Sequence, residues 1–238
     1  MDIEHFHSFK DRPSLISAGL DFCRTALTQA LAEKGEASLI GAGGSTPAPL
    51  YEHLAEQDLD WTNVLIGLSD ERWVPITHHA SNGAMVQATL LQKHAAKAKF
   101  IPLSPSVNEA KTAPEADTLK ALAQSYSPLT ETPDLVILGM GSDAHTLSWF
   151  PQADGLETAL DPTTSQTVCP IFARASRVTG EITTRLTLTY PVIARARHVL
   201  LLITGAEKRR VLEEAGPETP VAHMMQAAGT RLCVYWSP

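Results

Sequence analysis

The stretch PDLVILGMGSDAHTLSWFP, residues 133–151, carries the clearest indication of how this chain folds. It begins with four consecutive apolar residues, Leu135 to Leu138, and then changes to glycines followed by Asp143 and His145. A short run that is apolar at every position is typical of a strand buried on both faces, as in a parallel sheet. We therefore predict a buried strand that ends in a loop bearing a carboxylate and an imidazole.

The rest of the chain alternates similar apolar runs with helical patterns. A long helix is expected from Asp11 to Lys34, with Pro13 in its first turn and Gly35 at its end. Further strands are expected in ASLIGA, NVLIGLS, EITTRLTLT, HVLLLIT and RLCVYW, and helices in PAPLYEHLAEQ, SNGAMVQATLLQKH, PEADTLKALAQSYS, PVIARAR and AEKRRVLEEA. This alternation predicts the α/β class, with a mostly parallel central sheet covered by helices on both faces, a Rossmann-like open sheet.

Composition limits the classes of partner. The chain has 238 residues and an ordinary share of apolar residues, so we expect residues 1–238 to form a single domain. The formal net charge of -7 argues against binding to nucleic acid or to an anionic membrane surface. The three cysteines are widely spaced and form no metal or redox motif, which predicts reduced thiols in a cytoplasmic protein. The N-terminus lacks the layout of a signal peptide, and no apolar run is long enough to span a bilayer.

Four of the predicted strands end in polar or glycine-rich segments: LIGAGGSTP, LIGLSDERW, VILGMGSDAH and LLITGAEKR. The carboxyl ends of parallel strands lie along one edge of a sheet, and open α/β sheets bind ligands at that edge. We therefore expect these four segments, although distant in sequence, to face one crevice.

The glycine-rich segment allows two interpretations. Gly43 and Gly44 can bring backbone N–H groups close to an anion at a helix N-terminus, with Ser45 and Thr46 as hydroxyl donors. Alternatively, the segment is a tight turn in which Ser45 or Thr46 caps the following helix. It is not a Walker loop, because no Gly-Lys-Ser/Thr ending follows.

Three cations stand at unusual positions. Arg72 follows Asp70 and Glu71 at a strand end, where it could grip an oxyanion or belong to a solvated charge cluster. Arg185 lies within an alternating strand, and Lys208 opens a helix, where a cation opposes the helix dipole. An external anion would explain both positions, and so would a salt bridge to an internal acid.

His145 is the best candidate for proton transfer, because an imidazole has an ordinary pKa near 6.5 and can act as a base at neutral pH. Asp143 is close enough in sequence to orient the imidazole or to meet a substrate. The alternative is a histidine with a purely structural role.

Several blocks together resemble the 6-phosphogluconolactonase family: GGSTPAPLYEHL, LSDERWVP…HHASNGAMV, the opening stretch, TRLTLTYPVIARARHVLLLITGAEKRRVL and PVAHM. The resemblance runs from about Gly41 to the C-terminus. It implies hydrolysis of 6-phospho-D-glucono-1,5-lactone to 6-phosphogluconate in the oxidative pentose phosphate pathway, without a metal or an organic cofactor. The implied partner is a small phosphorylated sugar lactone, and the oligomeric state stays open, with a monomer compatible.

The resemblance also assigns roles to residues. His145 matches the histidine regarded as the general base that activates water, and Asp143 matches the aspartate of the same loop. Arg72 matches an arginine thought to contact the substrate. The expected substrate- and phosphate-binding residues are Gly43, Gly44, Ser45, Thr46, Asp70, Arg185 and Lys208.

One position departs from the family pattern. Ala144 stands between Asp143 and His145, where the family usually has glycine. We expect Ala144 to adopt a negative φ and to be compatible with activity. A catalytically silent sugar-phosphate-binding protein is the alternative that Ala144 alone supports.

A second alternative is an enzyme of the glucosamine-6-phosphate deaminase type, an aldose-ketose isomerase that several blocks also resemble. That type carries a glutamate shortly after the corresponding histidine. Here Trp149 and Phe150 stand where the acid would be expected, so the hydrolase is preferred.

Overall fold

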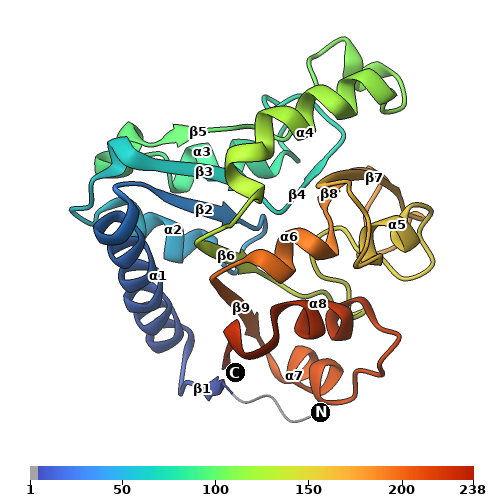
Figure 1. Cartoon of the computed structure of the whole chain (residues 1–238). Helices are drawn as coiled ribbons and strands as arrows, with labels where there is room; N and C mark the ends of the chain where they lie inside the picture. Colours follow the sequence, from blue (N-terminus) through green and yellow to red (C-terminus); the bar gives the residue numbers. More distant parts are fainter. Residues whose placement is uncertain (1–4) are drawn as a thin grey trace.

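The computed structural model describes residues 5–238, and within them a parallel sheet of seven strands forms the centre of the fold (Figure 1). The strand order is β1-β10-β9-β6-β2-β3-β5, and each neighbouring pair is parallel. The bounds are β1 Phe6–Ser8, β2 Ala37–Gly41, β3 Val64–Leu68, β5 Lys99–Phe100, β6 Leu135–Leu138, β9 His198–Thr204 and β10 Leu232–Ser237. The predicted mostly parallel open sheet is thus confirmed.

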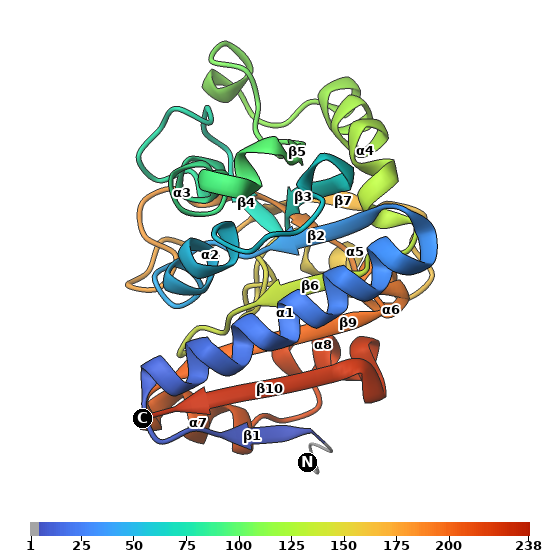
Figure 2. The ribbon, with the colours of Figure 1, turned by 90° about the vertical axis from the view of Figure 1, so that its left-hand side faces the viewer.

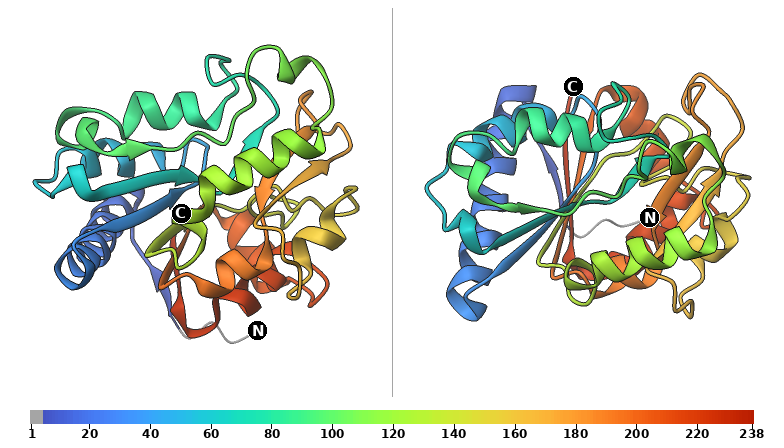
Figure 3. Two further views of the ribbon diagram at one scale, coloured as in Figure 1. Left: turned by 45° about the horizontal axis from the view of Figure 1, so that its top comes forward. Right: turned by 90° about the horizontal axis from the view of Figure 1, so that it is seen from above.

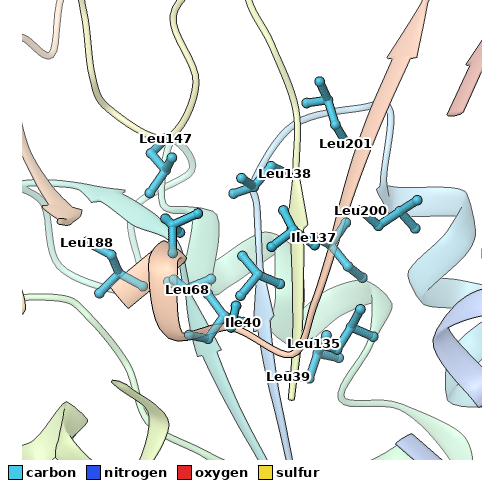
Figure 4. Close-up of a cluster of buried hydrophobic side chains, with 14 of the residues drawn as sticks. Leu39, Ile40, Leu68, Leu135, Ile137, Leu138, Leu147, Leu188, Leu200 and Leu201 are labelled. Carbon is cyan, nitrogen blue, oxygen red and sulfur yellow. The ribbon is translucent and has the colours of Figure 1, made fainter. Parts of the chain in front are cut away.

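The middle strands are apolar because they are covered on both faces. Every residue of β2 and β6 is buried. In the core, Leu39 of β2 lies beside Leu135 of β6, and Ile137 of β6 is paired with Leu200 of β9 (Figure 4). Burial of this kind stabilises the fold by roughly 1.5–3 kcal/mol for each fully buried large aliphatic side chain. It also fixes the carboxyl ends of the three strands relative to one another.

Helices cover both faces of the sheet. In Figure 1, α1 (Arg12–Lys34) and α2 (Ala48–Ala55) lie to one side, and α6 (Tyr190–Arg195) and α8 (Pro220–Ala228) lie to the other. Figure 2 shows α1 lying across the strands. The remaining α-helices are α3 Asn82–Thr89, α4 Ala116–Thr130, α5 Leu156–Leu160 and α7 Ala206–Glu213.

The predicted boundaries of α1 are confirmed. The Asp11 side chain accepts a hydrogen bond from the backbone N–H of Ser14 at 2.8 Å and so caps the first turn. Gly35 ends the helix at φ 75°, a left-handed conformation that glycine adopts without steric cost.

A second sheet adjoins the first and corrects one expectation. It contains β4 (Asp70–Arg72), β8 (Thr184–Leu188) and β7 (Val168–Phe172) in the order β4-β8-β7, and its pairs are antiparallel (Figure 3). The segment after β3 is therefore the strand β4 and not a strand-end loop. The strand predicted in EITTRLTLT belongs to this antiparallel sheet, where alternating residues are common because the two faces differ.

No helix within residues 5–238 combines the length and the apolar character that crossing a membrane requires.

Candidate active site

A cavity of about 260 Å³ lies where β2, β3, β6 and β9 end. The four segments predicted to share a crevice all contribute to it. Its polar lining comes from Gly43, Gly44, Ser45, Thr46, Asp70, Arg72, Asn82, His145, Arg185 and Lys208, and its apolar lining includes Met140, Leu147, Phe150, Val178 and Leu202. Asp143 is the one predicted site residue that is not part of this lining, and its carboxylate contacts the His145 imidazole.

The His145 imidazole is held from two sides. Its Nδ1 lies 2.5 Å from Oδ1 of Asp143, and the same oxygen accepts the backbone N–H of His145 at 3.2 Å. The Phe150 ring packs against the imidazole, with ring centroids 4.3 Å apart. With Nδ1 engaged by the carboxylate, Nε2 is the ring nitrogen available to a ligand.

Asp143 is suited to hold the imidazole as an anion. Partial burial alone would raise the pKa of Asp143, but the hydrogen bonds and the charge of His145 outweigh it and leave the pKa lowered. Asp143 is therefore ionised at neutral pH and can orient the His145 N–H.

The loop that carries the pair is a tight turn. The backbone N–H of Gly141 donates to the His145 carbonyl at 2.9 Å, and that of Ala144 donates to the Gly141 carbonyl at 3.2 Å. A Cβ at Gly141 would lie 2.2 Å from two atoms of the His145 ring, so glycine is needed there for close approach.

The expected negative φ of Ala144 is wrong, because the turn places it at φ 63°. This left-handed conformation is one that glycine adopts more easily than alanine. The Ala144 carbonyl accepts the backbone N–H of Val221 at 3.1 Å, which fastens the turn to the start of α8. His145 nevertheless lines the same cavity as Arg72, Arg185 and Lys208.

The glycine-rich segment does not cap the following helix through a side chain. Helix α2 begins at Ala48 with Pro47 at its N-cap, and no side-chain hydrogen bond caps it. The alternative that Ser45 or Thr46 is the N-cap is therefore wrong. Both residues instead line the cavity, and Gly44 adopts φ 99°.

Arg72 and Arg185 face each other directly across the antiparallel pair β4–β8. Like charges at opposed positions of neighbouring strands repel each other, so this arrangement favours a bound anion. The Arg185 side chain is buried, donates to the carbonyls of Thr179 and Ile182 at 2.6 and 2.8 Å, and lies 5.4 Å from the Phe150 ring centroid. Burial, assisted by the charge of Arg72, lowers the pKa of Arg185 to about 10, so the guanidinium stays charged at neutral pH.

Lys208 completes the cationic lining from the first turn of α7. Burial lowers its pKa, and the neighbouring Glu207 only partly opposes this effect. Within residues 5–238, Arg72, Arg185 and Lys208 form no salt bridge. Internal salt bridges therefore do not explain the positions of Arg185 and Lys208.

The acids beside Arg72 are buried, so the solvated charge cluster considered for this segment is wrong. Asp70 accepts hydrogen bonds from Ser69 Oγ at 3.0 Å and Ser148 Oγ at 2.6 Å. Glu71 is fully buried and is bonded to the start of α3. Sequence reasoning missed the contribution of Asn82, because a polar residue at a helix start is ordinarily a cap.

No group of three or more His, Cys, Asp or Glu side chains suited to a metal ion occurs in the described part of the chain.

Fold and site together define an α/β protein with a cationic crevice at the carboxyl edge of an open parallel sheet. The family model for glucosamine-6-phosphate isomerases/6-phosphogluconolactonase matches residues 10–234, so the chain belongs to this family. The 6-phosphogluconolactonase of Rhizobium meliloti strain 1021 is 37% identical, and the match covers 98% of this chain and 99% of the relative. That of Pseudomonas aeruginosa is 38% identical, over 89% of this chain and 86% of the relative.

Solved structures agree with these relatives. The crystal structure of a 6-phosphogluconolactonase from Shewanella baltica OS155 superimposes with a TM-score of 0.86 at 32% identity, covering 100% of this chain and 99% of that chain. A 6-phosphogluconolactonase from Thermotoga maritima gives a TM-score of 0.78 at 27% identity, covering 98% of each chain.

Proposed function

We propose that this protein hydrolyses 6-phospho-D-glucono-1,5-lactone to 6-phospho-D-gluconate. The observation that carries the proposal is one cavity that contains an imidazole held by a carboxylate and three cations without salt bridges within residues 5–238. The names of the relatives support the same activity. The cytoplasmic location and the pathway remain predictions from the sequence.

His145 acts as the general base in the proposed reaction. Its Nδ1–H donates to Asp143, so Nε2 takes a proton from water as the water oxygen bonds to the lactone carbonyl carbon. The bond between that carbon and the ring oxygen then breaks, and the imidazolium returns the proton to the departing oxygen. A positioned base of this kind contributes roughly a hundredfold to ten-thousandfold in rate.

The three cations of the cavity contact the charged and polar groups of the substrate. Arg185 and Lys208 bind the phosphate, together with backbone N–H groups of the segment from Gly43 to Thr46. Arg72 faces Arg185 across β4–β8, so it contacts the bound anion and also the lactone oxygens, where a donor directed at the developing oxyanion can contribute about 3 kcal/mol. Phosphate binding remote from the reacting carbon supplies energy that orients the ring toward His145.

The isomerase alternative is disfavoured by the groups around His145. Phe150 stands in the sequence segment where that type of enzyme is expected to carry its acid, and its ring packs against the imidazole. Trp149 is fully buried, and its indole N–H donates to the Leu188 carbonyl at 2.9 Å. Neither side chain can exchange a proton with a sugar, so a ring-opening deamination lacks its second acid-base group.

A pH-stat assay with freshly prepared lactone, corrected for spontaneous hydrolysis, tests the proposal. The wild-type protein should turn over the lactone, and His145→Ala should lower kcat at least about a hundredfold while remaining folded. His79→Ala is the matched control, because His79 is exposed and lies outside the cavity. Absence of wild-type turnover would leave the silent binding protein as the better interpretation.

A further inference from the structure

Asn82, the first residue of α3, joins two residues of the cavity wall. Its Oδ1 accepts a hydrogen bond from Nη1 of Arg72 at 2.7 Å, and its Nδ2 donates to the Asp70 carbonyl at 2.9 Å. The side chain is almost completely buried and lines the cavity. Because both ends of the carboxamide are bonded, the amide cannot rotate without losing a hydrogen bond.

The contact fixes one end of the Arg72 guanidinium. Nη1 donates to the Ala80 carbonyl and to Asn82 Oδ1, both at 2.7 Å, and these bonds use both of its hydrogens. Within residues 5–238, Nε and Nη2 of Arg72 have no hydrogen-bond partner. Nε is buried, so Nη2 is the donor that the anchored guanidinium leaves for a ligand.

Asn82 is itself held in place by Glu71. The Glu71 carboxylate accepts the backbone N–H groups of Arg72 and Asn82 at 2.7 Å and that of Gly83 at 2.8 Å, together with Ser81 Oγ at 2.7 Å. This buried carboxylate thus joins β4 to the start of α3. Burial raises the pKa of Glu71, because these donors only partly replace the hydration lost on burial.

The glycine-rich segment depends on the same amide. A Cβ at Gly43 would lie 1.9 Å from Oδ1 of Asn82, so the segment approaches Asn82 more closely than any side chain would allow. The amide is thus in contact with both walls of the cavity: the glycine-rich segment on one side and Arg72 on the other.

We infer that Asn82 is a positioning residue, which acts on the bound anion through Arg72. The identity of the anion rests on the proposed function, while the coupling of Asn82 to Arg72 does not. The competing explanation is that Asn82 only stabilises the start of α3.

A double-mutant cycle separates the two explanations. Phosphate affinity, measured by calorimetry with inorganic phosphate, and kcat/KM for the lactone would be compared in wild type, Asn82→Ala, Arg72→Ala and the double variant. Asn82→Ala should weaken phosphate binding about tenfold to a hundredfold, as expected for loss of a hydrogen bond to a charged group. In the Arg72→Ala background, Asn82→Ala should change phosphate affinity by less than about twofold. Losses that multiply in the double variant would overturn the inference.

Ser81→Ala is the matched control. Ser81 contacts the same Glu71 and caps α3 through the backbone N–H of Ala84, but it does not contact Arg72. It should lower the melting temperature while leaving phosphate affinity within about twofold. An equal loss of affinity in Ser81→Ala and Asn82→Ala would show that only the helix start matters.

A second variant covers the case in which Asn82→Ala does not fold. Asn82→Asp keeps the size of the side chain and an acceptor for Arg72, but places a negative charge beside the anion site. Phosphate affinity should fall at least about tenfold, and less in the Arg72→Ala background. Unchanged affinity would overturn the inference.

The two proposals can fail separately. A wild-type protein that binds phosphate with Asn82–Arg72 coupling, yet hydrolyses no lactone, would contradict the proposed function and retain the positioning role. A wild-type protein that hydrolyses the lactone, with losses that are independent in the double-mutant cycle, would support the proposed function and contradict the positioning role. Absence of any phosphate binding by the wild type would overturn the positioning role.

Discussion

Gly141→Ala tests whether the position of the His145 imidazole controls the rate. The added Cβ would lie 2.2 Å from Cε1 and Nδ1 of His145 and 2.6 Å from Oδ1 of Asp143, distances at which atoms cannot remain. The backbone of Gly141 does not adopt a positive φ, so alanine there is strained only by this contact. The His145 ring must turn away and give up its hydrogen bond to Asp143.

The cost to the rate should exceed the cost to stability. Loss of one hydrogen bond to a charged group lowers the free energy of unfolding by about 1–3 kcal/mol, and the half-buried position of the pair favours the lower end. Displacement of a catalytic group by about 1 Å can cost a hundredfold in rate. We therefore expect kcat to fall about a hundredfold, with a loss of stability of about 1–2 kcal/mol.

The assay is pH-stat turnover of fresh lactone beside urea unfolding of the same samples. Ser142→Ala is the control, since Ser142 is exposed in the same loop and lies outside the cavity lining. If Gly141→Ala retains a kcat within several-fold of wild type, the close contact between Gly141 and His145 does not determine the reaction, and the assigned role of His145 is refuted.

Two further predictions concern charge. Lys208→Ala should lower kcat/KM for the phosphorylated lactone far more than for unphosphorylated gluconolactone, and an equal loss on both would show that Lys208 does not bind the phosphate. The pKa of Asp143 is lowered from its ordinary value of 3.8, so its ionised form adds stability above that pH, which is lost as the pH falls through the lowered value. In urea unfolding, Asp143→Asn should thus be destabilised at pH 7 and much less so toward pH 2, and an equal destabilisation at both would contradict the charge argument.

The long apolar runs made the central sheet predictable. Strands β2, β6 and β9 are buried along most or all of their length, so most of their residues are apolar and the pattern was clear. Strands β1 and β5 have only three and two residues, too few to show any pattern. Strand β4 was missed because its three residues are all charged, and the contacts that bury them come from elsewhere in the chain.

The placement of residues in the cavity was predictable where the chemical type of a residue drew attention to it. His145 and Lys208 were expected in the crevice because an imidazole or a cation at a strand end needs an explanation, and both line the cavity, while their roles stay predictions. Asn82 contacts Arg72, and Phe150 contacts His145 and Arg185; such contacts become visible only in three dimensions.

Ala144→Gly tests the position at which the sequence suggested the wrong backbone conformation. At φ 63° alanine carries about 1–2 kcal/mol of strain that glycine would relieve. Glycine in turn gains about 0.4–1 kcal/mol of conformational freedom in the unfolded chain and loses a buried methyl worth up to about 0.8 kcal/mol. These terms nearly cancel, so the free energy of unfolding should change by less than about 1 kcal/mol, measured by urea unfolding.

The kcat of Ala144→Gly shows whether the methyl group of Ala144 affects catalysis. The turn is already fixed by the bond from Val221, and His145 already faces the cavity, so kcat should stay within about twofold of wild type. Ala144→Val provides the contrast, because a β-branched residue at positive φ is strongly strained and should destabilise the protein well beyond alanine. A tenfold rise of kcat in Ala144→Gly would mean that alanine holds His145 away from its productive position, and that the wild-type protein is closer to a silent binder than to an efficient hydrolase.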